Sequence, residues 1–468
     1  MAVSKQDESF RQYALNGSPL KVLLTVCTPL ALYQALHMIF KVLDALMASH
    51  ISSDAVSAVS CLSQITLMIT ALGSGLAVGG SIKISEAYGR GDYETVSRRV
   101  ATLYAMAVVV SIAVIVVLIP FAEPFLRLLK TPEALIETGA GYFRVEVLSL
   151  VVSFFNTVYI AIERSRGHAK RILKLNLMII VVKLGLSALF VYVIESGVIM
   201  IAVATLVSQS MLLLYALCKM PRDEGAFRFS FHNISGKKDT LLPILNLAYP
   251  VSAEKMLFSA GKVLVNSMSG VYGELTVGAL GVSNNIGGLT TGFHAGMLDG
   301  ASSLISQNRG AGKYRRTLTL YYWLVAMDVL IGAIGLVAVQ FTLPSLAKIF
   351  AQSRDYFDQD FCDMIVAIHS WEMLGYITLG VNSATLALLL GYGYTKLTLV
   401  LNVARVFLFR VPVLWAFQQY TTIGWEAVGM TMMISNICAG LSAVVVAIPV
   451  IMKIRRKAAE ESKEGVIL

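Results

Sequence analysis

The sequence is poor in charge and in the motifs of soluble enzymes. Of its 468 residues, 14% are charged and 56% hydrophobic, with a mean hydropathy of +0.70. A globular domain carries about 25% charged residues. This shortage excludes a soluble enzyme, a disordered scaffold and a secreted disulfide framework. The apolar runs are also continuous over about 20 residues, which excludes a transmembrane β-barrel with its alternating segments of about 10.

Cysteine and signal features are equally sparse. The five cysteines are scattered without metal-ligand or redox spacing, so we interpret them as small apolar core residues. Asp7, Glu8 and Arg11 precede the first apolar run, which is unlike a cleavable signal. The Gly-x-Gly loops lack a following Lys-Ser/Thr, and no nucleophile stands at a fixed spacing from a base. We therefore expect no enzyme, no metal and no cofactor, and any transport must be secondary.

What the sequence does contain is a series of long apolar segments. They predict an all-α polytopic membrane protein with twelve transmembrane helices. The expected spans are 22–47, 56–86, 100–122, 136–161, 174–194, 198–218, 242–270, 276–306, 318–342, 362–390, 397–418 and 427–452.

The net charge of +9 is explained by where the cations stand. Between the spans, 26 lysines and arginines fall on one side and 4 on the other. The positive-inside rule then places both termini in the cytoplasm of a multi-pass protein of the plasma membrane. The positive charge thus reflects topology, and we expect the lipid bilayer, not nucleic acid, as its partner.

The chain repeats itself at an offset of 221 residues. Pro29 aligns with Pro250, Lys41 with Lys262, and 18 of 65 positions are identical over residues 29–93. Both halves start on the same side, which is a parallel repeat typical of transporters. We predict two pseudo-symmetric six-helix lobes: 1–219 with spans one to six, and 241–468 with spans seven to twelve and a cytoplasmic tail. The polar stretch 220–240 is the expected cytoplasmic linker. Two bundles without a function at their interface remain an alternative.

The repeated residues resemble a known family. The loop Ser306–Tyr314 reads SQNRGAGKY, its first-half partner reads GRGDY from Gly89, and Val42-Leu43-Asp44 follows the first-span proline. Together they resemble the multidrug and toxic compound extrusion (MATE) family of prokaryotes, with the DinF-like branch closer than the eukaryotic one. The resemblance implies two lobes around a central cleft, and efflux of small organic compounds or drugs by antiport against H⁺ or Na⁺.

Fourteen charged residues fall in or near the spans, where an unpaired charge at the bilayer centre costs about 2.5–3.5 kcal/mol. Tyr33, His37, Lys41 and Asp44 step by 4, 4 and 3 along one face of the first span. The resemblance implies that Asp44 is the coupling carboxylate. A permanent Asp44–Lys41 pair without that role remains an alternative.

In the family that the sequence resembles, many prokaryotic members place Asn and Asp for a Na⁺ site at the positions of Lys183 and Ser187, and some place Asn at the position of Lys41. A Na⁺ site needs oxygen ligands, and an ammonium supplies none. We therefore expect Asp44, Lys41, Lys183 and Ser187 to form a proton-coupling site, although Na⁺ coupling stays possible.

The second half supplies the other candidates for a substrate cleft. Besides Tyr33 and His37, these are Glu254, Lys255, Lys262, Asn266, His369, Glu372, Tyr376, Asn402 and Arg405. His369, Glu372 and Tyr376 step by 3 and 4, and His369 is either a proton relay or a hydrogen-bonding partner. Within the spans, cations exceed acids, which favours anionic or zwitterionic substrates. Arg410, near a span end, is expected to snorkel.

The proposed conformational hinges are prolines and glycines. They are Pro29, Pro250, Gly75, Gly79, Gly296 and Gly300. Proline permits bending, whereas glycine also permits close helix packing without a hinge, and both interpretations stay open. A second functional hypothesis is a flippase or exporter of anionic or lipid-linked substrates. We expect a monomer.

Overall fold

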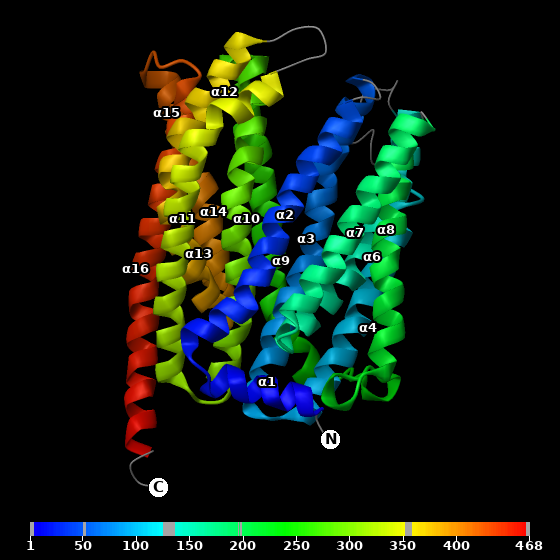
Figure 1. Ribbon diagram of the computed structural model, residues 1–468, viewed down its shortest axis with the longest axis vertical. Coiled ribbons are helices and arrows are strands. Elements are labelled where there is room, and N and C mark those ends of the chain that lie inside the picture. Colours follow the sequence, from blue (N-terminus) through cyan, green and yellow to red (C-terminus); the bar gives the residue numbers. More distant parts are fainter. Residues whose placement is uncertain are drawn as a thin grey trace. The chain divides into compact units, whose positions relative to one another are not determined.

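The computed structural model describes the backbone of residues 4–49, 53–124, 136–194, 196, 199–351 and 358–464. It describes their side chains except in 41–65, 136–139 and 462–464. Over these ranges the chain is almost entirely helical and contains no strand (Figure 1).

The membrane helices follow one another in the predicted order. In the first half they are α2 (Pro19–Ser49), α3 (Ser53–Arg90), α4 (Tyr93–Leu118), α6 (Ile136–Ser165), α7 (Ala169–Ala188) with the π-helical turn η2 (Leu189–Val193), and α8 (Ile199–Lys219). In the second half they are α9 (Lys238–Ser269), α10 (Glu274–Gly310), α11 (Tyr314–Ala351), α12 (Gln359–Glu372), α13 (Tyr376–Gly391), α14 (Thr395–Ala404), α15 (Val411–Tyr420) and α16 (Glu426–Glu464). The 3₁₀ turn η7 (Met373–Gly375) joins α12 to α13, and the π-helical turn η8 (Arg405–Arg410) joins α14 to α15.

Ten of these described segments are long and apolar enough to cross a bilayer. Helices α9 and α10 have the length, with 32 and 37 residues, but contain more polar residues and glycine. With these two, the helices match the twelve predicted spans. The prediction of an all-α polytopic membrane protein is therefore confirmed.

The sequence repeat reappears in the backbone. Gly91 and Gly312 have φ of 79° and 75°, and the pair Gly167 and Gly393 has φ of 79° and 76°. Glycine adopts such positive φ angles readily because it has no Cβ. In the first pair, each glycine N–H donates to a carbonyl three residues earlier at 3.1 Å. The two halves thus use the same turns at matching positions.

The chain divides by contacts into two compact units. The first comprises Met1–Gly17 and Ile39–Met256, and the second comprises Ser18–Met38 and Leu257–Leu468. This division departs from chain order at α2 and α9. The first half of α2 packs within the second unit, and the first half of α9 packs within the first unit.

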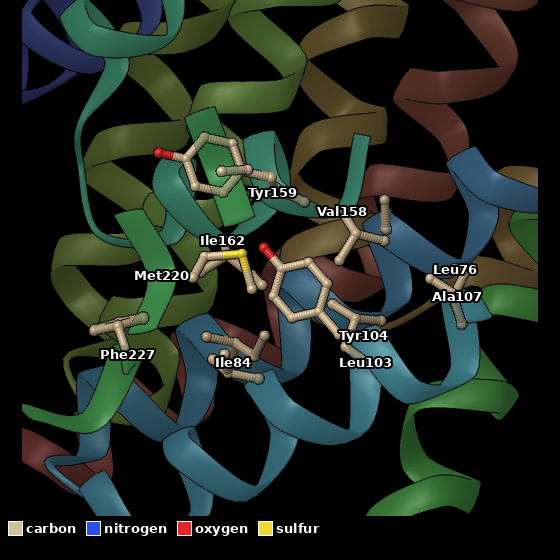
Figure 2. Packing of buried hydrophobic residues seen from close by; sticks show 14 of the residues in the cluster. Leu76, Ile84, Leu103, Tyr104, Ala107, Val158, Tyr159, Ile162, Met220 and Phe227 are labelled. Atoms are coloured by element: carbon tan, nitrogen blue, oxygen red, sulfur yellow. The ribbon is translucent and has the colours of Figure 1, made fainter. Parts of the chain in front are cut away.

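Each unit has its own apolar core. In the first unit, Ile84, Leu103 and Ile162 from three helices pack with Met220 and Phe227, which follow α8 (Figure 2). The start of the predicted linker is therefore part of this core. The core of the second unit is built from Val265, Leu280, Ile365, Ile368, Leu379 and Met432.

A short helix that the sequence analysis did not predict, α1 (Lys5–Asn16), precedes the membrane helices. The Ser4 hydroxyl accepts the N–H of Asp7 at 3.1 Å, and the acids Asp7 and Glu8 stand in the first turn. Both features favour a helix start. Twelve residues gave too little apolar periodicity to reveal the helix.

Arg166, in the turn between α6 and α7, is the centre of a buried ion-pair network. Its guanidinium lies 3.2 Å from Asp7, 3.0 Å from Glu163 and 2.7 Å from Asp223, and it stacks on the Phe227 ring at 4.9 Å. Burial lowers the pKa of Arg166, but the three acids outweigh that effect and hold the pKa above its ordinary value. This Arg166 network connects α1, the α6–α7 turn and the start of the predicted linker.

Further cations complete the network. Glu163 also pairs with Arg171 at 2.8 Å and with His168 at 2.9 Å, and Asp223 pairs with Lys219 at 3.3 Å. The sequence showed most of these cations as topology signals. The structure shows that three of the arginine and lysine side chains also neutralise acids that folding buries.

Candidate functional site

The predicted coupling face of the first span lies on one continuous helix, α2. The side chains of Lys41 and Asp44 lie outside the described residues. Tyr33 and His37 are half-buried, with ring centroids 6.1 Å apart and ring planes at 39°. The coupling role of Asp44 and Lys41 stays a prediction.

Lys183 and Ser187 lie one turn apart on α7 in the first unit. Lys183 is half-buried, whereas Ser187 is fully buried. The Ser187 hydroxyl has no hydrogen-bond partner in the described part of the chain. Buried hydroxyls are normally hydrogen-bonded, so an unpartnered one is unusual. Its oxygen can still donate or accept one hydrogen bond. Its predicted place in a coupling site remains a hypothesis.

In the second unit, helices α10, α12 and α13 bring four polar side chains together. Ser283 Oγ donates to Glu372 Oε2 at 2.6 Å and lies 2.8 Å from His369 Nδ1. Tyr376 Oη lies 2.8 Å from His369 Nε2. All four residues are buried, and His369 is fully inaccessible. We call Ser283, His369, Glu372 and Tyr376 the Glu372 cluster.

Two protonation patterns satisfy every contact in this cluster. In both, the Glu372 carboxylate accepts from Ser283, and the serine oxygen accepts the N–H at His369 Nδ1. His369 Nε2 either accepts the hydroxyl proton of Tyr376 or donates its own proton to the tyrosine oxygen. The arrangement is a chain of proton donors and acceptors that ends on a buried carboxylate.

Local backbone features position the cluster. The 3₁₀ turn η7 separates Glu372 from Tyr376 and continues the helix direction from α12 into α13. Gly287 on α10 leaves room for the cluster, because a Cβ there would lie 3.2 Å from Tyr376 Oη and 3.4 Å from His369 Cε1. The predicted grouping of His369, Glu372 and Tyr376 is present in the structure, and Ser283 is a member that the sequence did not indicate.

Two arginines lie beside this cluster. Arg405 donates to Asn436 Oδ1 at 2.7 Å, and Arg410 donates to the same oxygen at 3.4 Å and to Ser435 Oγ at 3.1 Å. The π-helical turn η8 explains the shared partner, since its wider turn brings residues five apart to one side. The positive charge of Arg410 attracts the carboxylate of Glu372.

The expectation that Arg410 snorkels is wrong. Arg410 is buried, and the helix continues from η8 into α15 to Tyr420, so the residue stands within a span. Ser435 and Asn436 on α16 were also missed, because short polar side chains in an apolar run carry no periodic signal.

The predicted cleft residues Lys262 and Arg405 meet at one aromatic ring. Lys262 Nζ lies 5.3 Å and Arg405 Cζ 5.6 Å from the centroid of Phe258. Each contact is a cation–π interaction. The Phe258 ring is therefore a shared contact of two predicted cleft cations.

The other predicted cleft residues are spread along two helices. Glu254 is half-buried and Lys255 exposed, on the part of α9 that belongs to the first unit. Asn266 and Asn402 are half-buried in the second unit. Their roles in substrate binding stay predictions.

The predicted hinge glycines are points of close helix approach. A Cβ on Gly75 would lie 2.7 Å from the carbonyl oxygen of Ala248, and one on Gly79 would lie 2.7 Å from the Ala248 nitrogen. In the second unit, a Cβ on Gly296 would lie 2.2 Å from Ala31 Cα. Each contact therefore requires a residue without a side chain.

The remaining hinge candidates follow the same symmetry. A Cβ on Gly300 would lie 2.8 Å from Cys27 Sγ. Pro29 lies inside α2 and Pro250 inside α9, near these contacts, and neither ends its helix. Bending at these positions stays a prediction.

The family model named MatE matches the chain twice, over residues 29–193 and 250–416. The two matches begin at the two prolines of the repeat. Probable multidrug resistance protein YpnP of Bacillus subtilis (strain 168) is 22% identical over 418 residues, which cover 89% of this chain and 92% of the relative. Probable multidrug resistance protein NorM of Thermotoga maritima is 21% identical over 416 residues, covering 86% and 87%.

Solved structures share the fold. A MATE crystal structure in complex with MaL6 superposes with a TM-score of 0.91 at 20% identity, covering 97% of this chain and all of that one. A MOP superfamily transporter from Pyrococcus furiosus, described by the reverse polarity of its binding pocket, superposes with a TM-score of 0.90, with the same identity and coverage.

Proposed function

Since this chain belongs to the MatE family, whose model matches most of its length, we propose that it is a secondary antiporter. In this proposal it exports small organic compounds from the cytoplasmic side of the plasma membrane, and protons enter the cell in exchange. Both termini would be cytoplasmic, and the protein would act as a monomer. Two lobes would alternate in exposing a central cleft to the two sides.

The observation that carries the proposal is the Glu372 cluster. A buried carboxylate is suited to coupling, because its protonation depends strongly on water access and neighbouring charge. Glu372 lies next to a serine, a histidine and the charge of Arg410. A conformational change that altered these neighbours would change whether Glu372 holds a proton. Asp44 would be the corresponding group in the first half.

The same cluster supports a substrate with charges of both signs. Glu372 can attract an ammonium group, and the guanidiniums of Arg405 and Arg410 can hold a carboxylate or phosphate. An ammonium group that replaces the proton on Glu372 gives the competition that antiport requires. We therefore propose zwitterionic substrates first and anionic substrates second.

The test uses purified protein in sodium-free vesicles with an imposed pH gradient. We expect transport of zwitterionic or anionic compounds, lost in Glu372→Gln and Asp44→Asn. The matched control is Asp363→Asn, an exposed acid on the same helix as Glu372. Transport that is absent without sodium and returns when sodium is added would refute proton coupling. Export of permanent cations alone would refute the substrate class.

The second candidate, a flippase of anionic lipid-linked substrates, is favoured by the cations that meet at Phe258 and Asn436. A fluorescent lipid with an anionic head group distinguishes the two. Its movement between leaflets would support the flippase, and its exclusion combined with export of soluble compounds would support the antiporter.

A further inference from the structure

A second histidine–carboxylate pair lies inside the second unit, outside the Glu372 cluster. His294 Nδ1 on α10 lies 2.8 Å from Asp328 Oδ1 on α11. Asp328 is fully inaccessible and His294 is 4% exposed. Both stand near the middle of their helices, where a charge is costly unless it is paired or titrates.

The surroundings fix this pair in place but leave it incompletely satisfied. Ser383 on α13 donates to the His294 carbonyl oxygen at 2.9 Å. A Cβ on Gly380 would lie 2.5 Å from the Asp328 carbonyl oxygen and 3.1 Å from His294 Cε1, so α13 closes tightly over the pair. Among the described residues, no group meets hydrogen-bond geometry at His294 Nε2 or Asp328 Oδ2, although the Ser383 hydroxyl also acts on the Asp328 carboxyl group. The His294 ring therefore keeps Nε2, and the Asp328 carboxyl group keeps Oδ2, for a further hydrogen bond or a proton.

The titratable groups around the pair are few. On α10, Asp299 accepts a hydrogen bond from Gln34 at 3.4 Å, and the charges of Asp299 and Asp328 both act on the Cys27 thiol of α2. The one ion-pair partner of Asp328 among the described residues is His294. A buried carboxylate whose single ion-pair partner is a histidine is placed to bind a proton.

A polar face of α10 joins this pair to the Glu372 cluster. Ser283, Gly287, Thr290 and His294 step by 4, 3 and 4, which places them along one side of the helix. All four are buried. Ser283 contacts Glu372, and Gly287 faces Tyr376 and His369, as described above. At 1.5 Å per residue, the two histidine–carboxylate pairs stand about 16 Å apart along the axis.

We propose that Asp328 and His294 form a second proton-binding site of this unit, connected to the Glu372 cluster by this buried face of α10. A proton from water binds Asp328 Oδ2, and the neutral carboxyl group keeps the hydrogen bond from His294 Nδ1–H to Oδ1. Each site loses one negative charge when it is loaded. The proposal rests on proton coupling as the proposed function and adds one proton per transported substrate to those bound at Glu372 and Asp44.

The experiment measures protonated carboxyl groups by infrared difference spectroscopy during a pH titration of the purified protein. Among the bands, we expect one that is missing in Asp328→Asn and a different one that is missing in Glu372→Gln. Asp363→Asn, an exposed acid, should leave both. In vesicles, Asp328→Asn should lower the proton-to-substrate ratio by one. An unchanged spectrum and ratio in Asp328→Asn would overturn the proposal and leave the pair a structural contact.

A second measurement covers the case in which Asp328→Asn fails to fold. Folded Asp44→Asn protein carrying ¹³C-labelled aspartate should still show a protonated aspartate band that shifts with the label, and its absence would overturn the site. The band reports proton binding whether or not protons drive transport. Failure of this site is therefore distinguishable from failure of the proposed antiport.

Discussion

Replacing Arg166 by methionine tests the network at the α6–α7 turn. The change removes the cation that contacts Asp7, Glu163 and Asp223, all buried. Methionine keeps much of the arginine's apolar length, so the main loss is electrostatic.

The expected loss of unfolding free energy depends on which partners each of the three acids keeps in the variant. Glu163 keeps Arg171 and His168, and Asp223 keeps Lys219. Asp7 keeps the Ser4 hydroxyl at 2.7 Å, and among the described residues it has no second cation. Removing one partner of a buried ion pair costs about 3–5 kcal/mol. We expect Arg166→Met to lose that amount of unfolding free energy, most of it through Asp7.

The assay is unfolding of the purified protein by SDS, followed by circular dichroism of the helices. The control is Arg98→Met, whose pair with Glu94 is exposed and should be worth about 0–1 kcal/mol. The double variant Arg166→Met/Asp7→Asn should recover most of the loss, because it removes the charge left without a cation. A loss no larger than that of Arg98→Met, or no recovery in the double variant, would refute the reasoning.

Three further predictions concern two glycines and a helix cap. Gly296→Ala should lose about 1–3 kcal/mol of unfolding free energy and slow transport, because its Cβ would overlap the α2 backbone. In the control Gly281→Ala, the new Cβ meets no atom within 4 Å, so this variant should be neutral or more stable. Equal unfolding curves for the two variants would contradict the prediction. Gly312→Ala should cost about 1–2 kcal/mol from its φ of +75° alone, and an unchanged thermal midpoint would count against it. Asp92→Ala should cost about 1 kcal/mol, since Asp92 caps α4 by accepting the Thr95 N–H at 3.1 Å. Burial raises the pKa of Asp92, but its hydrogen bonds and nearby arginines lower it below the ordinary value. The ionised Asp92 side chain thus contributes fully to the free energy of unfolding above the unfolded-state pKa of about 3.9, and this contribution disappears as pH falls through the lower folded-state pKa. An Asp92→Ala variant that melts like wild type at neutral pH would argue against the cap.

Residues within one predicted span were the part of the site that sequence periodicity could predict. His369, Glu372 and Tyr376 were grouped from their steps of 3 and 4, and the structure joins them through hydrogen bonds. Ser283 and Arg410 come from other helices. No spacing rule links them to Glu372, because their proximity depends on how the helices pack.

The sequence by itself determined the membrane class, the twelve helices and the repeat. These depend on local apolar composition and on turns that need glycine at Gly91, Gly167, Gly312 and Gly393. Tertiary structure alone decided which charges are paired. The Arg166–Asp7 pair joins residues 159 positions apart, and the His294–Asp328 pair joins residues 34 positions apart. Burial makes each charge depend on a partner that only packing can supply, so the same residues that signalled topology became structural and candidate functional groups.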